Sequence, residues 1–297
     1  MIDGVLVVDK PAGRTSHQVV AEVSRRLGRV KTGHAGTLDP MATGVLVVLV
    51  GEATKLAAVL TADAKSYDGE LELGVETDTL DADGQVVRER RAQAAAIDRA
   101  GLEAAMARFV GAGRQTPPMY SAIRQGGRRL HEIARAGVEV ERAARPVEIT
   151  RFDLVGFDPP RASFAVDCSK GTYVRSLVAD LGEALGCGGH LTRLRRTRSG
   201  PFDLSRALPL AEVEPDSAAA RLVSLADSVG HLRKVEVEGA GLARAVSTGK
   251  PMKWNDLSSD PAPSETVALV AGDALLALAE VDPETGRVRY RRVFRAA

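Results

Sequence analysis

The chain has 297 residues, of which 44% are hydrophobic, so it can bury one large core or a large core with a smaller companion. This composition excludes a disordered chain, and the longest apolar run, residues 45–50, is far too short to cross a membrane. The net charge of +1 conceals 32 Arg against 8 Lys. Clustered Arg favours a polyanionic partner, but a generally Arg-rich composition gives the same count, so composition alone leaves nucleic-acid binding open.

The first ninety residues predict alternating strands and helices. Residues 4–10 are a buried strand, and the Lys10-Pro11 turn behind it suits a first strand better than a signal peptide. Thr15 or Ser16 can cap the helix that follows. The predicted elements are a strand at 4–10, a helix at 15–28, a strand at 44–51, a short helix near 52–60, a strand at 65–74 and a loop at 77–87.

The middle of the chain predicts more helix, and its end has a different pattern. The predicted elements are a helix at 97–111, an extended segment at 114–127, a helix at 128–137, strands at 147–157 and 161–171, and a helix at 172–186. From about residue 232, short strands surround a Pro/Ser/Asp-rich stretch at 255–266. This change predicts a large α+β domain at 1–230 and a small, mostly β module at 231–297.

Several familiar kinds of chemistry have no motif in this sequence. There is no phosphate-binding P-loop, no dinucleotide-binding glycine motif and no zinc-protease helix. Cys187 and His190 have no further metal-ligand partners, and a calcium-like loop counted from Thr79 ends in Arg90 instead of an acid. We therefore predict no metal and no cofactor. With only Cys168 as a second cysteine, the sequence fits a reducing cytoplasm.

One loop, KTGHAGTLDPMATG at residues 31–44, stands out as a candidate site. Its carboxylate, Asp39, precedes a proline, and an isolated Asp-Pro is usually only a turn or a helix cap. Here the loop also carries Gly33, Gly36 and Gly44, which let a backbone approach a ligand closely. The loop leads directly into a buried strand, which would hold it rigidly. We therefore predict that Asp39 has a functional role.

Six sequence blocks together resemble the bacterial tRNA pseudouridine synthase B family. They are GVLVVDKPAGRTSHQVV, KTGHAGTLDPMATGVLVVLVGEATK, KSYDGELELGVETDTLDADG, QTPPMYSAIRQGGRRLHEIAR, CSKGTYVRSLVADLG and GHLTRLRRTRSGPF, in the family's order between residues 4 and about 210. The resemblance implies an α+β pseudouridine synthase fold, with a central, mostly antiparallel mixed sheet flanked by helices. It also implies a small PUA-like, RNA-binding C-terminal domain, although residues 231–297 match the family only weakly.

The resemblance implies an isomerase that converts uridine to pseudouridine at position 55 in the TΨC loop of tRNA, without a cofactor. Asp39 matches the family's catalytic aspartate. Tyr67 matches the tyrosine that stacks on the target base and helps to remove the C5 proton. Arg175 matches the arginine that forms an ion pair with the aspartate and keeps it charged.

Other positions match residues that bind the RNA or the flipped base. His34 matches the histidine that enters the space left by the flipped nucleotide, and Tyr173 and Leu194 match residues of the base pocket. Lys10 is expected to support the site. The basic segments are expected to contact RNA phosphates, including three arginines of a loop at 115–135: Arg124, Arg128 and Arg129. Arg124 stands where the family usually has Lys.

The expected partner is the TΨC stem-loop of tRNA, bound by a cytoplasmic monomer that needs no protein partner and no membrane. Two alternatives remain at this point. The chain could be a tRNA-folding chaperone whose role does not depend on catalysis. It could also be a glycoside hydrolase that pairs Asp39 with Asp78 or Asp81, but only 4% of its residues are aromatic, which provides little sugar-binding platform.

Overall fold

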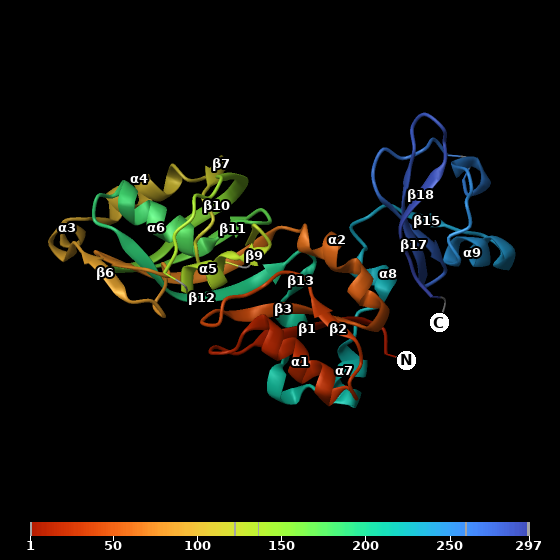
Figure 1. Ribbon diagram of the computed structural model, residues 1–297, viewed down its shortest axis with the longest axis horizontal. Coiled ribbons are helices and arrows are strands. Elements are labelled where there is room, and N and C mark those ends of the chain that lie inside the picture. The colour runs from red at the N-terminus through yellow and green to blue at the C-terminus, as the bar shows by residue number, and fades with distance from the viewer. Residues whose placement is uncertain (1, 122, 136, 259, 296–297) are drawn as a thin grey trace.

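The computed structural model describes residues 2–121, 123–135, 137–258 and 260–295, and shows an α+β protein (Figure 1). A ten-stranded mixed sheet carries helices on its faces, and a separate four-stranded sheet follows at the C-terminal end. Most neighbouring strands of the large sheet are antiparallel, while two neighbouring pairs are parallel. The predicted fold class is therefore confirmed.

The N-terminal half of the large sheet is built on the two most apolar strands of the chain. Strand β1 (Gly4–Lys10) pairs with β3 (Thr43–Val50) along seven residue pairs, and both are buried on their two faces. Helix α1 (Ser16–Arg26) packs on this half through its buried valines, and Thr15 caps it as predicted. The remaining strands of this half are β2 (Thr32–His34) and β14 (Leu208–Pro209).

The second half of the large sheet is centred on a strand that the sequence analysis missed. This strand, β12 (Gly189–Ser199), pairs with β4 (Lys65–Leu73) along nine residue pairs. Its four arginines and the odd spacing of Leu191 and Leu194 leave no alternating pattern in the sequence; an irregularity in the pairing between Leu191 and Arg193 lets both leucines enter the same core. The other strands and helices of this half are β11 (Arg161–Cys168), β10 (Arg145–Asp158), β7 (Gly111–Gln115), β13 (Phe202–Asp203), α4 (Arg99–Ala107) and α6 (Val174–Ala184).

One predicted segment differs in part from the structure. The predicted loop at 77–87 is confirmed for its larger part, since it connects the two strands of a hairpin, one ending at Thr77 and the other beginning at Val86. The expected extended segment at 114–127 ends in a second hairpin that turns at Gly126-Gly127. Glycines in a left-handed conformation make that turn easy instead of preventing regular structure. The elements concerned are β5 (Val75–Thr77), β6 (Val86–Glu89), β8 (Arg124–Gln125), β9 (Arg128–Arg129) and α5 (Leu130–Arg135).

Short helices join these parts. They are η1 (Gly51–Leu56), α2 (Ala57–Thr61), α3 (Arg91–Ala95), η2 (Leu204–Arg206), η3 (Leu210–Glu212), α7 (Pro215–Arg221) and α8 (Leu225–Ser228).

The C-terminal module has a core of its own around Trp254, Leu269 and Leu276. A second apolar cluster joins it to the back of β1 and β3, where Phe294 is completely buried. The module begins close to the predicted boundary at residue 231, although the domain division and its PUA-like character stay predictions. Its elements are β15 (Lys234–Glu236), α9 (Ala240–Ser247), η4 (Trp254–Asp256), β16 (Val267–Ala271), β17 (Ala274–Val281) and β18 (Val288–Val293).

The two halves of the large sheet meet along a very short parallel contact between β3 and β12. Only two residue pairs form it, Thr43 with Arg195 and Gly44 with Arg196. Gly44 has φ +95°, and a Cβ atom there would lie 2.2 Å from the carbonyl oxygen of Arg196. Because that neighbour is backbone, it cannot move aside easily, so this close contact requires glycine.

We therefore expect Gly44→Ala to destabilise the protein by about 2 kcal/mol or more, because the methyl group clashes and the positive φ is strained. The measurement is the free energy of unfolding in denaturant. Gly241→Ala is the matched control, since Gly241 lies in helix α9 with open space around it, and that change should be neutral or stabilising. Equal effects of the two substitutions would contradict the role assigned to Gly44.

Candidate active site

The loop that carries Asp39 connects β2 to β3 and is fastened from both sides. The buried hydroxyl of Ser16 donates to the carbonyl of Leu38 at 3.0 Å and accepts from the N–H of Leu38 at 2.8 Å. The Lys10 Nζ donates to the carbonyl of Pro40 at 3.1 Å. Both residues flanking Asp39 are therefore held by β1 and α1, which fixes the direction of the carboxylate.

Asp39 forms an ion pair with Arg175, which comes from the other half of the large sheet. The Arg175 Nε lies 2.8 Å from Asp39 Oδ2, and Nη2 donates to Oδ1 at 3.1 Å. The Arg175 side chain is 4% exposed, whereas that of Asp39 is 32% exposed. A substrate can therefore reach the carboxylate while its cationic partner stays covered.

Arg175 itself is fixed by further acceptors. Its Nη1 lies 3.2 Å from Asp81 Oδ2, and its guanidinium donates to the carbonyls of Thr79 and Tyr120 at 2.8 and 3.0 Å. Burial raises the pKa of the Asp39 carboxyl above its ordinary value; the Arg175 charge opposes this rise, and Asp81 adds to it. The protonation state of Asp39 therefore depends directly on Arg175.

Asp81 is the member of this group that the sequence analysis did not assign to the predicted active site. It was weighed only as a second carboxylate of a glycoside hydrolase, whereas the structure places it on the far side of Arg175 from Asp39. In the sequence, Asp81 stands among other acidic residues in a predicted loop, a pattern that indicates a solvent-exposed turn. Asp78, the other candidate, accepts a hydrogen bond from the backbone of Gln85.

Tyr67 lies in β4 with its side chain 7% exposed, and Asp39 is among the charged groups near its hydroxyl. Burial raises the pKa of this phenol, so Tyr67 is neutral near pH 7. Tyr173 precedes α6, and its backbone exchanges two hydrogen bonds with the side chain of Gln115. Leu194 of β12 lies opposite Gly69 in the sheet and packs in the same core as Tyr67.

His34 and Lys10 flank the loop at its two ends. His34 is half-buried at the end of β2, and burial, followed by the charge of Arg196, lowers the pKa of its imidazole, which is therefore neutral near pH 7. Lys10 is completely buried, and burial lowers the pKa of its amine to about 8, with Asp39 opposing the shift. Its ammonium donates to three backbone carbonyls, two of them in the turn after β1.

The three arginines expected to contact phosphates lie on the small hairpin of β8 and β9. Arg128 is exposed on β9, and no contact in the described residues connects it to Asp39. The side chains of Arg124 and Arg129 are outside the described part of the structure. The RNA-contacting role of this hairpin stays a prediction.

Arg196 lies in a basic segment that was expected to contact RNA phosphates, but this residue is buried. Its side chain is 1% exposed and its guanidinium points under the Asp39 loop, where it donates to the carbonyls of Val45, Thr37 and Gly36. No ion pair with a carboxylate is formed by Arg196 within the described residues. A run of arginines in sequence does not reveal which one turns inward.

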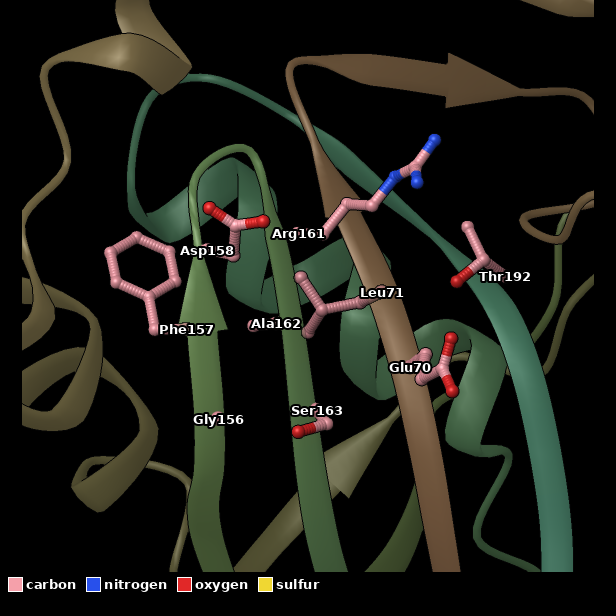
Figure 2. A pocket seen from close by; sticks show the side chains of 9 residues that line it. All are labelled: Glu70, Leu71, Gly156, Phe157, Asp158, Arg161, Ala162, Ser163 and Thr192. Atoms are coloured by element: carbon pink, nitrogen blue, oxygen red, sulfur yellow. The ribbon is translucent and has the colours of Figure 1, made fainter.

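Two hollows lie elsewhere on the large sheet. Figure 2 shows the first, about 330 Å³, between β4, β10, β11 and β12; it is lined by Glu70, Asp158 and Arg161 among others and contains no predicted site residue. The second, about 510 Å³, borders Lys10 and Thr43. Among the described residues, no group of three His, Cys, Asp or Glu side chains could hold a metal ion, and no helix is long and apolar enough to span a membrane.

Comparisons with known proteins agree with this architecture. A model of the N-terminal domain of TruB family pseudouridylate synthases matches residues 24–174, and one of the tRNA pseudouridylate synthase B C-terminal domain matches 175–235. The tRNA pseudouridine synthase B of Aromatoleum aromaticum is 47% identical over 82% of this chain and 79% of its own length. That of Syntrophotalea carbinolica is 41% identical over 96% of this chain and 94% of its own length.

A solved structure shares the fold over nearly the whole chain. One chain of a Cbf5–Nop10–Gar1 complex superimposes with a TM-score of 0.76 at 27% identity, covering 98% of this chain and 84% of that one. The fold and the sequence matches together define a pseudouridine synthase acting on tRNA, which is an isomerase. Within that class, the chain belongs to the TruB family, the tRNA pseudouridine synthases B.

We expect Ser16→Ala to lower the free energy of unfolding by about 1–3 kcal/mol, because it leaves the N–H and the carbonyl of Leu38 without their partner. Denaturant unfolding monitored by circular dichroism measures the change. The exposed Ser205 provides the control, since Ser205→Ala should change stability by less than about 0.5 kcal/mol. A Ser16→Ala protein as stable as the control would show that the loop is held by other contacts.

Proposed function

We propose that this protein isomerises uridine 55 in the TΨC loop of tRNA, with Asp39 as the catalytic carboxylate. The observation that carries the proposal is the partly exposed Asp39 carboxylate paired with the covered guanidinium of Arg175. The family supplies the reaction class, and this geometry supports the choice of Asp39 as the carboxylate that performs the chemistry. The position of the target uridine follows from the resemblance of the sequence.

The reaction breaks the bond between N1 and C1′ and forms a bond between C5 and C1′. C5 loses a proton and N1 gains one, so the product is an isomer and no external oxidant or reductant takes part. Asp39, kept anionic by Arg175, acts as a nucleophile or stabilises positive charge while the base is detached. Tyr67 stacks on the base and assists removal of the C5 proton.

The target nucleotide has to leave the stacked loop, because its glycosidic carbon is inaccessible inside it. We assign the neutral ring of His34 to the vacated space and the side chains of Tyr173 and Leu194 to the base pocket. Phosphates on either side would be held by arginines, including the exposed Arg128 of the β8–β9 hairpin. The buried Lys10 supports the Asp39 loop and makes no direct RNA contact in this assignment.

We expect Asp39→Asn to abolish pseudouridine formation while the affinity for tRNA stays within about tenfold, because the amide keeps the shape but not the charge. Pseudouridine is mapped by position in an unmodified tRNA transcript, and binding is measured by filter retention. Full activity of the variant would refute the assignment. If Asp39→Asn restored tRNA folding in cells without modifying tRNA, the protein would also have the role of a tRNA-folding chaperone.

We expect Arg175→Gln to move the acidic limb of the pH–rate profile to higher pH. The Arg175 charge holds down a pKa that burial raises, so without it Asp39 is protonated at a higher pH and the active, ionised form is lost there. Single-turnover rates on a tRNA transcript across the pH range measure the shift. Arg99→Gln, which removes an exposed helix ion pair, should leave the profile unchanged. An unshifted limb in the Arg175 variant would contradict this account.

A further inference from the structure

We propose that Arg196 is a positioning residue for catalysis, which holds the Asp39 loop at a set distance from Tyr67. The inference rests on the proposed role of Asp39 and adds a residue that touches neither the substrate nor the carboxylate. The contacts of Arg196 are independent of the role of Asp39, since they concern how the loop is attached to the sheet.

The guanidinium of Arg196 holds the loop on both sides of Asp39. Nη2 donates to Gly36 O at 3.1 Å and Nη1 to Thr37 O at 3.3 Å, both before Asp39 in the chain. Nε donates to Val45 O at 2.7 Å, after it. One rigid, planar group therefore joins the two ends of the loop, which a lysine with a single ammonium cannot reproduce.

These contacts cross the short junction between the two halves of the large sheet. Arg196 belongs to β12, in the half that also contains Tyr67 and Arg175, whereas the Asp39 loop belongs to the other half. Only two residue pairs connect β3 to β12, so the strand pairing alone gives the loop little support. The three hydrogen bonds from Arg196 add to this junction at the loop itself, while the ion pair of Arg195 with Asp9 joins the halves at β1.

Arg196 also lies opposite Tyr67 in the pairing of β12 with β4, and its charge acts on the Tyr67 phenol, where it opposes the rise in pKa caused by burial. Arg196 thus holds the loop of one proposed catalytic residue and is the cross-strand neighbour of the other. A buried cation without a carboxylate partner is costly, and an apolar side chain of similar size would fill the space at lower cost. The three fixed carbonyl contacts explain why a charged group occupies this position.

The test compares Arg196→Lys with Arg99→Lys, a control on the exposed face of α4. For each protein, thermal unfolding checks the fold, filter retention gives the dissociation constant for tRNA, and a single-turnover assay gives the rate. Hydrogen exchange is followed at the amides of Leu38 and Ala42, which donate to the hydroxyl of Ser16 and to the carbonyl of Asp39. If Arg196→Lys does not fold, Arg196→Gln replaces it, since its planar amide can still donate to two carbonyls.

We expect the single-turnover rate of Arg196→Lys to fall about 100-fold with little change in tRNA affinity, because a small displacement of a catalytic group costs about that much. Exchange at Leu38 and Ala42 should accelerate while exchange in the core of β1 does not. Combining the change with Tyr67→Phe should give less than the product of the two separate losses, since the two residues are cross-strand neighbours at one site.

An unchanged rate, or faster exchange throughout the protein, would overturn the inference and leave Arg196 with a role in stability alone. One measurement needs no variant. In the unaltered protein, the loop amides and the amides of β12 should exchange their hydrogens in the same opening event. Loop amides that exchange independently of β12 would also overturn it. These outcomes are separate from a failure of the proposed function, which would appear as activity retained by Asp39→Asn.

Discussion

The ion pair between Asp39 and Arg175 is the interaction on which the site depends, because it joins two parts of the chain that no strand pairing brings together. Asp39 comes from the loop ahead of β3, and Arg175 from the first turn of α6 in the other half of the sheet. Covering a guanidinium is costly unless acceptors surround it. Here Asp81 and two backbone carbonyls complete the set of acceptors around Arg175.

Buried cations recur around this loop, and each is matched to backbone carbonyls. Lys10 donates to the carbonyl of Pro40 in the loop and to two carbonyls in the turn after β1. Arg196 donates to the carbonyls of Gly36 and Thr37 in the loop and to that of Val45 in β3. Fixed donors of this kind place positive charge near Asp39 without binding its carboxylate oxygens, which both face Arg175. Burial, which raises the pKa of Asp39, and the nearby Arg175, which opposes that rise, together set how readily the carboxylate ionises.

Much of the framework was predictable from local pattern. The strand at 4–10, the helix capped by Thr15 and the strand from Thr43 were all expected from apolar periodicity and capping residues, and the structure contains them. Strand β12 was missed because its arginines and its irregular pairing leave no apolar alternation in the sequence, although it is central to the sheet. The role of Asp81 was missed as well, because its partner Arg175 is 94 residues away in the sequence and no local signal connects them.

The sequence by itself determined the family, the apolar strands and the residue types offered for chemistry, because these depend on local order and on recognisable motifs. Only the tertiary structure decided which arginine faces the solvent and which is buried. Four arginines lie within six residues of β12, and Arg196 alone among them is almost completely covered. The physical reason is that strand direction and sheet pairing set the orientation of each side chain. Both depend on residues far away in the chain, here the contact of Arg196 with Gly44.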